Sequence, residues 1–349
     1  KNIKICYNLY RKIDFFMKEG IMIMAKLKLG SLFAGIGGID LGFKLAGVNP
    51  VWANEIDEFC AKTFIPNHTK TKLLVEDVNK VKAKQIPFID ILAGGFPCQP
   101  FSVAGNRKGF DDDRGGLFFQ IIRLIEELDQ ERRKPKVIFL ENVKNMYTHD
   151  NGKTYLKMKT ELQNRGYHIV EKIMNTCEYG NIPQNRERLY IVGFLNEEAK
   201  KRFKWPEKIK LTNTIENVIN WSGEGVDKKY FYTESNKCWD LLNSEMTQKH
   251  SIYQFRRVYV RENKSGVCPT LTANMGMGGH NVPLIRDDEN KIRKLTPREC
   301  LSLQGFPETF VIPSDVADSK IYKQAGNSVS VNVIKRIAEE ILKALKENE

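Results

Sequence analysis

The sequence predicts a doubly wound α/β protein with a mostly parallel sheet, followed by a second, smaller unit. Short apolar runs alternate with amphipathic stretches over the first half of the chain, as strands and helices do in a parallel sheet. After about Trp205, Asn, Ser, Thr, Gly and aromatic residues increase and helical periodicity weakens. Apolar residues return at helical spacing from Val329 to Leu345, so we expect a closing helix that packs back on the first domain.

The individual elements follow from the apolar runs. The predicted strands are 27–33, 51–54, 89–93, 137–140, 167–175 and 189–194. The predicted helices are 39–46, 58–64 and 117–128, and in the second unit helical periodicity persists only near 239–242. We expect an N-terminal extension (1–24), a first domain (25–204), a second domain (205–321) and a C-terminal segment (322–349) that completes the first domain.

Composition restricts the class of protein. The 349 residues are 41% hydrophobic, which suffices for a full core. With 55 Lys and Arg against 43 Asp and Glu, the net charge of +12 favours a polyanionic partner. No apolar run reaches the roughly 18–20 residues of a membrane span. Charges are scattered through the stretch before Met24, unlike a signal peptide, so we expect a cytoplasmic protein without a membrane partner.

The seven cysteines are dispersed, without CxxC pairs or neighbouring pairs of histidines. This spacing predicts neither a disulfide framework nor a zinc site, and we expect no metal. In a reducing compartment most of these cysteines should be small core residues.

A glycine-rich segment, FAGIGG from Phe33 to Gly38, lies between the first strand and the first helix. Small residues there let a ligand approach the backbone and the helix N-terminus. Asp40 occupies the place of the third glycine of the dinucleotide fingerprint, which disfavours a nicotinamide cofactor. Alone, the segment could be a turn without a ligand. Glu55 ends the next strand roughly twenty residues further on, the usual place of a ribose-binding acid, so together they predict an adenosyl ligand.

Cys98 lies in GGFPCQPFS, the loop after the strand 89–93. Open α/β sheets place their active sites at the carboxyl ends of such strands. A core cysteine would more naturally lie within the apolar run, whereas Cys98 has two glycines and a proline before it and a proline after it, which fix the backbone. We therefore interpret it as a thiolate nucleophile.

Three charged residues are further candidates for the site. Glu141 follows the strand 137–140, at the same edge of the sheet as Cys98. A carboxyl group at a strand end is often only a solvated cap. Beside a nucleophile, however, Glu141 is a candidate acid with a raised pKa. Arg186 and Arg188 lie two apart on an extended segment and should point the same way, toward a shared anionic or carbonyl-bearing ligand. A surface ion-pair ladder is the alternative for these arginines.

Four motifs have now been described: the glycine-rich segment, the Cys98 loop, the strand end at Glu141 and the segment with Arg186 and Arg188. In this order they resemble the motifs of the DNA (cytosine-5) methyltransferases of the bacterial restriction–modification type. The resemblance runs from about Leu27 to the end and includes the segments 294–300 and 324–329. It implies a Rossmann-like, class I S-adenosylmethionine-dependent fold with a DNA-reading second domain. A transfer-RNA cytosine methyltransferase is the nearest alternative enzyme, but the second domain and the PCQP loop favour duplex DNA. A catalytically dead DNA-binding factor would be expected to lose Cys98, Glu141 or the glycine-rich turn.

The resemblance also implies a cofactor pocket for S-adenosylmethionine. Glu55 would bind the ribose, Ile56 would lie against the adenine and Asp77 would meet its amino group. The residues expected to line the pocket are Phe33, Gly35, Ile36, Gly37, Gly38, Glu55, Ile56, Asp77, Val78, Gly95, Pro97, Leu117, Asn327 and Val329.

For catalysis the resemblance implies that Cys98 adds to C6 of a flipped cytosine and that Glu141 supplies a proton at N3. Arg188 would hold O2, and Arg186 would order the nucleophile loop and the flipped nucleotide. Some relatives fill the gap left by the base with a hydroxyl where this chain has Ala104.

The expected partner is double-stranded DNA, bound by a monomer, with a possible cognate endonuclease that acts on the same site without a stable complex. Arginines of the second domain could read guanine or bind phosphate, and the sequence leaves both open. The expected DNA-binding residues are Gln99, Ser102, Arg107, Lys108, Arg256, Arg257, Arg261 and Thr270.

Overall fold

The computed structural model describes residues 26–97, 116–256, 258–277 and 281–346. Several predictions fall outside these residues. They concern the extension 1–24 and the residues Cys98, Gln99, Ser102, Ala104, Arg107, Lys108 and Arg257.

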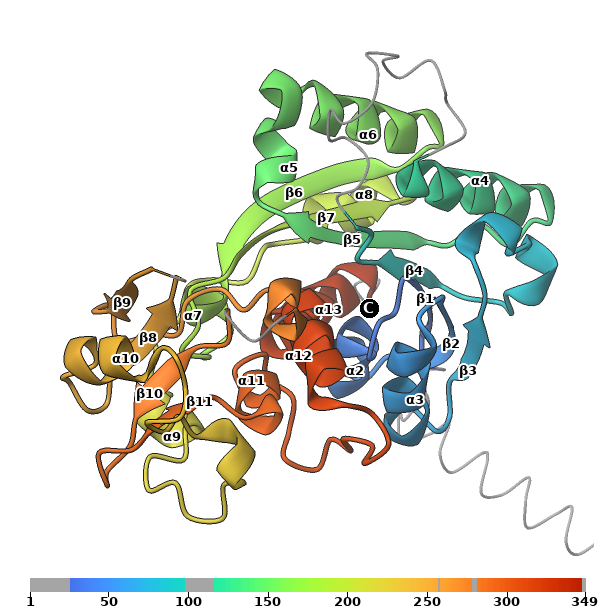
Figure 1. The fold of residues 1–349 in the computed structure, drawn as a ribbon. Coiled ribbons are helices and arrows are strands. Elements are labelled where there is room, and N and C mark those ends of the chain that lie inside the picture. The colour runs from blue at the N-terminus through green and yellow to red at the C-terminus, as the bar shows by residue number, and fades with distance from the viewer. Residues whose placement is uncertain (1–25, 98–115, 257, 278–280, 347–349) are drawn as a thin grey trace, which may run out of the picture.

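A seven-stranded sheet in the order β3-β2-β1-β4-β5-β7-β6 forms the centre of the first domain (Figure 1). β7 runs antiparallel to both β5 and β6, and the other neighbours are parallel. This confirms the predicted mostly parallel sheet. The strands are β1 (Lys28–Leu32), β2 (Asn49–Glu55), β3 (Lys72–Val75), β4 (Ile91–Gly94), β5 (Val137–Val143), β6 (His168–Asn175) and β7 (Glu187–Phe194).

Helices cover both faces of this sheet, as expected for a doubly wound fold (Figure 1). α4 and α6 pack on one face, and α2, α8 and α13 on the other. In β5, Ile138 and Leu140 join the first core cluster, and Val137 and Phe139 join the second, because successive side chains of a strand point to opposite faces. The helices of this domain are α2 (Gly38–Leu45), α3 (Glu58–Asn67), α4 (Leu117–Gln130), α5 (Asn145–Thr148), α6 (Lys153–Asn164), α7 (Thr176–Tyr179) and α8 (Glu197–Arg202).

The closing helix α13 (Val331–Leu345) lies against α2, so the predicted return to the first domain is confirmed. Ile334, Ile337 and Ile341 are fully buried in the same cluster as Phe43. Gly42 permits this close approach: a Cβ there would lie 2.6 Å from the Cβ of Ile334.

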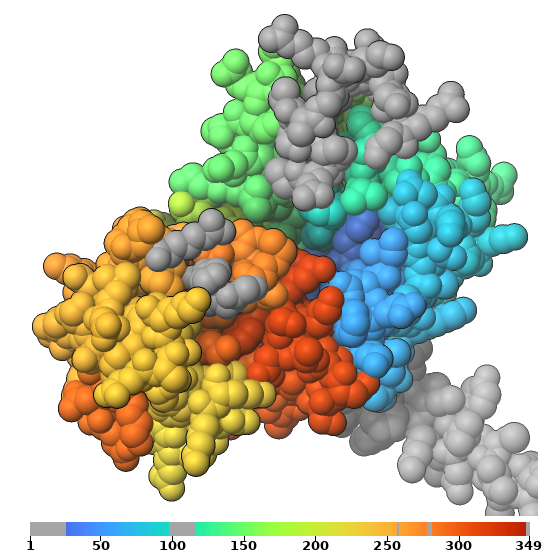
Figure 2. Space-filling model, in the orientation of Figure 1, coloured from blue at the N-terminus to red at the C-terminus, as the bar shows by residue number. Residues whose placement is uncertain are grey.

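The second unit is built around a small antiparallel sheet in the order β11-β10-β8-β9. Its strands are β8 (Ile252–Phe255), β9 (Val260–Asn263), β10 (Leu284–Arg286) and β11 (Ile292–Lys294). The helices between residues 205 and 330 are α9 (Ile215–Val218), α10 (Trp239–Glu245), α11 (Pro297–Ser302) and α12 (Asp318–Asn327). α10 confirms the periodicity near 239–242. Figure 2 shows the yellow and orange second unit on one side, the blue and green first domain on the other, and the red C-terminal segment between them.

No helix in the described part of the chain is both long enough and apolar enough for a membrane span. Within the same residues, no group of three or more His, Cys, Asp or Glu side chains is arranged to hold a metal ion.

Candidate active site

A cavity of about 990 Å³ lies where β1, β2, β4 and β5 end, and residues 323–329 contribute one of its walls. Every residue expected to line a cofactor pocket borders it except Gly37. Glu141, Arg186 and Arg188 border the same cavity, so the fold brings the described catalytic candidates and the cofactor candidates together. Lining residues that the sequence patterns did not single out include Asn54, Asp57, Asn79, Asn142, Lys323 and Ser328.

The glycine-rich turn is held in shape by its own backbone. Phe33, Gly35 and Gly37 all have positive φ (54°, 57° and 83°), a conformation that costs little only for glycine. The Gly37 amide donates to the Ala34 carbonyl over 2.8 Å. The strained Phe33 therefore marks a backbone shape fixed by its surroundings.

Gly37 has a packing role instead of the predicted place on the cavity wall. A Cβ at this position would lie 2.1 Å from Nε2 of the buried His68, so only glycine fits. Nε2 of His68 lies 3.3 Å from the Ile36 carbonyl oxygen, and burial lowers the pKa of His68 to about 4. His68 is therefore a neutral side chain that packs against the glycine-rich turn at Ile36 and Gly37.

Glu55 links the turn to the end of β2. One carboxylate oxygen accepts from the Gly35 amide over 2.7 Å. The other accepts from the amides of Ile56 and Asp57, at 2.9 and 2.8 Å. Because a carboxylate has about four acceptor positions, these three bonds leave capacity for a ligand hydroxyl.

The cavity offers an apolar surface and a second acid beyond Glu55. The side chain of Ile56 is 63% exposed although it borders the cavity, which leaves apolar area for a ligand to cover. Asp77 begins the short helix η1 (Val78–Lys80) and accepts from the Asn79 amide and side chain over 2.9 and 2.7 Å.

Glu141 and Arg188 form an ion pair at the catalytic end of the cavity. Nε of Arg188 lies 3.1 Å from Oε1 of Glu141, and the two side chains are only 13% and 10% exposed. The antiparallel register pairs Arg188 with Val143, two residues from Glu141, so the two side chains meet diagonally. Burial raises the pKa of Glu141, and the nearby Arg188 and Arg186 charges oppose that shift.

Arg186 is buried and bonded to main-chain carbonyl groups, which excludes the surface ion-pair ladder for this residue. It is 2% exposed, and its guanidinium donates to the carbonyls of Leu271 (2.9 Å), Gly326 (3.2 Å) and Ser328. The carbonyl groups that it meets thus belong to the protein, but Arg186 also borders the same cavity as Arg188, so its role toward the nucleophile loop and the flipped nucleotide stays a prediction. Burial lowers the pKa of Arg186 to about 9, so it remains charged at neutral pH.

Asn142 is a site residue that the sequence patterns missed. Its side-chain amide donates to the Phe96 carbonyl over 2.9 Å, and its oxygen accepts from the Val143 amide over 2.8 Å. The only sequence signal is its place directly after Glu141 at the end of a strand.

The described residues expected to contact DNA from the second unit do not border the cavity. Arg256 and Arg261 are exposed at the two sides of the β8–β9 turn, and Arg256 donates to Gln254 over 3.1 Å. The Thr270 hydroxyl donates to the Asn185 carbonyl over 2.7 Å, so it fastens its segment to the loop before β7. DNA contacts by these three residues stay predictions.

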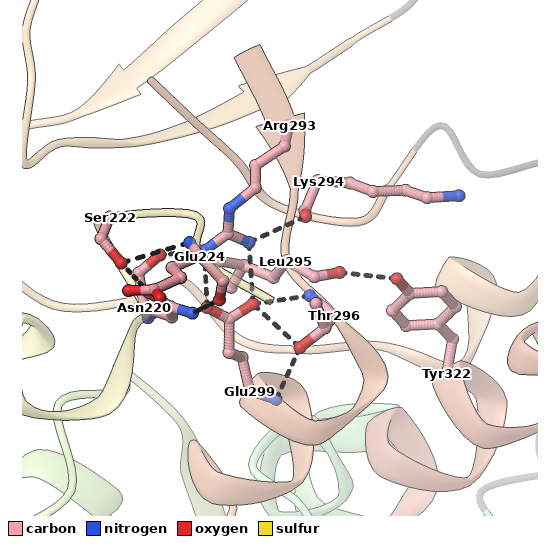
Figure 3. Close-up of polar contacts among 9 residues, drawn as sticks. All are labelled: Asn220, Ser222, Glu224, Arg293, Lys294, Leu295, Thr296, Glu299 and Tyr322. Carbon is pink, nitrogen blue, oxygen red and sulfur yellow. Dashed lines mark hydrogen bonds and ion pairs between the residues drawn. The ribbon is translucent and has the colours of Figure 1, made fainter. Parts of the chain in front are cut away.

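A buried ion pair joins several segments of the second unit (Figure 3). Both terminal nitrogens of Arg293 contact Glu299, over 2.9 and 2.8 Å, and Arg293 is fully buried. Glu299 also accepts from the amides of Thr296 (2.7 Å) and Asn220 (2.9 Å), which caps α11 and ties it to the 220 loop. The Tyr322 hydroxyl, on α12, donates to the Leu295 carbonyl over 2.6 Å.

The sheet order, the glycine-rich turn and the acids after successive strands define a class I S-adenosylmethionine-dependent methyltransferase fold. The chain belongs to the family of C-5 cytosine-specific DNA methylases, whose family model matches residues 27–343. It is a DNA cytosine-5 methyltransferase, as the resemblance of its motifs implied.

Individual relatives agree with this family. The chain is similar to the Type II methyltransferase M.Bsp6I of Bacillus sp. (strain RFL6), with 53% identity over 323 residues that cover 91% of this chain and 99% of the relative. It is 40% identical to the Type II methyltransferase M1.ScrFI of Lactococcus lactis subsp. cremoris over 331 residues, which cover 93% of this chain and 80% of that protein. The crystal structure of S. pombe Dnmt2 methyltransferase shares the fold, with a TM-score of 0.69 and 22% identity over 92% of this chain and all of that one.

Proposed function

We propose that this methyltransferase flips a cytosine out of duplex DNA and methylates it at C5 through a covalent Cys98 adduct. The observation that carries the proposal is the Glu141–Arg188 pair, which borders the same cavity as the glycine-rich turn and the Gly95–Pro97 segment leading to Cys98. A stacked base does not reach such a pocket, so the cytosine must leave the helix at a cost of a few kcal/mol.

The cavity fits S-adenosylmethionine. Glu55 retains acceptor capacity for ribose hydroxyls, Asp77 is an acceptor for the adenine amino group, and Ile56 offers apolar area to the adenine ring. The backbone at Gly35 is open, because a Cβ there would have nothing within 4 Å. When bound, S-adenosylmethionine supplies the methyl group.

The protein's own groups act on the cytosine. The Cys98 thiolate forms a bond to C6, and the C5–C6 π electrons shift toward C4 and N3. Glu141 gives its proton to N3 and so offsets the developing negative charge, which is typically worth about 10²–10⁴ in rate. Arg188 donates to O2 and holds the ring. Once C5 carries the methyl group, with S-adenosylhomocysteine as the leaving group, a base removes the C5 proton and the sulfur leaves C6 as a thiolate, which restores the C5–C6 double bond. N3 returns its proton to Glu141, which leaves the ring neutral.

Recognition of the DNA sequence belongs to residues 205–321 in this proposal, and residues 322–349 complete the catalytic domain formed by 25–204. The net charge of +12 and the exposed Arg256 and Arg261 support contacts to phosphate or guanine. We further propose that a cytoplasmic monomer protects host DNA within a restriction–modification system, as the names of the Type II relatives suggest. A cognate endonuclease would then act on the same site without a stable complex.

Bisulfite sequencing of DNA treated with the purified protein and S-adenosylmethionine tests the activity. We expect a single cytosine to be protected within one short recognition sequence. DNA that remains fully convertible would contradict the proposal. Methyl groups found only at positions other than C5 of cytosine would also contradict the proposal.

The Cys98→Ser variant tests the nucleophile. We expect it to lose methyl transfer and to retain DNA binding, because serine is a much weaker nucleophile than a thiolate at neutral pH. With 5-fluorocytosine at the target position, the wild type should form a covalent complex visible on a denaturing gel, and the variant should not. Turnover close to that of the wild type would exclude Cys98 as the nucleophile.

A further inference from the structure

Asn142 extends the contact between β4 and β5 beyond the end of the backbone ladder. The parallel register pairs Gly94 with Leu140 as its last step. Two residues further along each segment, within β5 and just after the end of β4, the Asn142 side chain donates to the Phe96 carbonyl over 2.9 Å. A side-chain amide thus makes the next link at the point where main-chain pairing stops.

The two contacts of Asn142 determine how its amide is oriented. The Val143 amide can only donate, so the oxygen of Asn142 must face it, and the Phe96 carbonyl can only accept, so the NH₂ group must face that carbonyl. Asn142 is 3% exposed, so water does not replace either partner at low cost.

The held carbonyl lies close in sequence to the proposed nucleophile. Phe96 is followed by Pro97 and then Cys98, and proline fixes its own φ near −65°. The ring of Phe96 is buried 5.8 Å from that of Phe118, which holds the same residue from its side chain. Few rotations therefore separate the anchored Phe96 carbonyl from the Cys98 thiol.

We propose that Asn142 is a positioning residue that aims the Cys98 thiol at C6 by holding the Phe96 carbonyl. The inference rests on the proposed function, because it assumes that Cys98 is the nucleophile. Although Asn142 borders the cavity, it acts through Phe96 in this role, because both ends of its amide are bonded to protein groups. Since misplacement of a reacting group by about 1 Å can cost about 100-fold in rate, loss of one anchor should slow the chemical step and not binding.

The test compares single-turnover methylation at saturating duplex and S-adenosylmethionine in the wild type, Asn142→Asp and Asn142→Ala. Asn142→Asp keeps an acceptor for the Val143 amide and loses the donor to Phe96, whereas Asn142→Ala loses both without adding charge. We expect each variant to be about 10- to 100-fold slower. Dissociation constants for the duplex and for S-adenosylhomocysteine should stay within about twofold of the wild type, since the polar groups of Asn142 are bonded to Phe96 and Val143 and not directed at a ligand.

Asn67→Asp provides a matched control. Asn67 also bridges two segments through both ends of its amide: it donates to the Val311 carbonyl over 2.9 Å and accepts from the Val311 amide over 2.7 Å. It does not border the cavity. We expect Asn67→Asp to lower the unfolding midpoint but to keep the single-turnover rate within about twofold, because neither Asn67 nor Val311 borders the cavity.

The outcomes separate the hypotheses. The positioning role is overturned if Asn142→Asp keeps a rate within about threefold of the wild type, if the loss lies in ligand affinity, or if Asn67→Asp loses as much rate. If Asn142→Ala does not fold, Asn142→Asp alone decides. A wild type that methylates no duplex would overturn the proposed function, whereas an active wild type with unimpaired Asn142 variants overturns only the role of Asn142.

Discussion

At the scale of single residues, burial decides which protonation states the active site uses. Glu141 is 8% exposed, and removal from water raises its pKa. The Arg188 guanidinium 3.1 Å away favours the ionised form and limits the shift. Because burial and the Arg188 charge act in opposite directions, Glu141 can keep its proton to a higher pH than an exposed glutamate. It can still release that proton to N3 of the cytosine.

The pH dependence of the single-turnover rate should reveal this proton. A raised pKa means that Glu141 is protonated at low pH and loses its proton as the pH rises through the folded-state pKa, so the rate should fall on the alkaline side. Glu141→Gln cannot supply the proton and should be about 10²–10⁴-fold slower, without that alkaline fall. The measurement is a pH series of single-turnover rates for both proteins; an identical alkaline fall in Glu141→Gln would argue against the assignment.

Asp40 is a buried acid in α2 whose charge the mechanism does not use. Its side chain is fully buried, and one oxygen accepts from the Ser31 hydroxyl over 2.8 Å. The other oxygen has no hydrogen-bond partner within the described residues. Burial raises the pKa of Asp40 to about 7. Since the folded-state pKa lies above the unfolded value, the stability from this group is complete below about pH 4 and is lost as the pH rises through 7.

Asp40→Asn should therefore remove a pH dependence of stability. From pH 5 to 8 the wild type should lose free energy of unfolding, by at most about 4 kcal/mol for a shift of this size. The Asp40→Asn variant, which has no titrating group at this position, should lose much less free energy of unfolding. It should therefore be more stable than the wild type at pH 8. Urea unfolding at both pH values measures this, and parallel losses in the two proteins would refute it.

At the scale of elements, helices with strong apolar periodicity were predicted from the sequence, whereas helices with weak periodicity were missed. α4 and α13 carry wide apolar stripes and were predicted close to their observed bounds. α6 buries only Thr154, Tyr155, Met158 and Leu162, a narrow stripe, and was missed. β3 is a four-residue edge strand without buried residues, and its alternation is too short to detect.

The Arg293–Glu299 pair (Figure 3) makes α11 depend on a residue of β11. Arg293→Met should destabilise the protein by about 3–5 kcal/mol, because it leaves Glu299 charged and buried without its partner. Arg293→Met with Glu299→Leu should cost clearly less than the two single changes added together. A double-mutant cycle of urea unfolding measures the coupling, and additive losses would mean that the pair does not act as a unit.

At the scale of the whole molecule, positive charge is the property most directly linked to DNA. The excess of twelve positive charges over 349 residues suits a surface that displaces counterions from phosphates. The first domain, the second unit and the C-terminal segment are joined through Arg186, whose contacts reach 85 and 140 residues along the chain. The cavity therefore exists only in the assembled protein.

DNA affinity should fall steeply with salt, by about 0.9 in log K per unit of log salt for each phosphate contact. Arg256→Ala and Arg261→Ala separate the two roles left open for these exposed arginines. A phosphate-binding arginine should lower the slope by about 1 for all sequences, and a guanine-reading arginine should cost about 1–3 kcal/mol of discrimination at one position. Fluorescence anisotropy over a salt series measures both, and a flat salt response would contradict electrostatic binding.

The sequence by itself determined the fold class, the family and the described residues at the strand ends, such as Glu55 and Glu141. These are local signals, because strand polarity and apolar spacing are written in neighbouring residues. Tertiary structure alone decided that Gly37 makes room for His68, that Arg186 binds main-chain carbonyls and that Asn142 holds Phe96. Each of those contacts joins segments far apart in the sequence, and only packing brings such segments within hydrogen-bond distance.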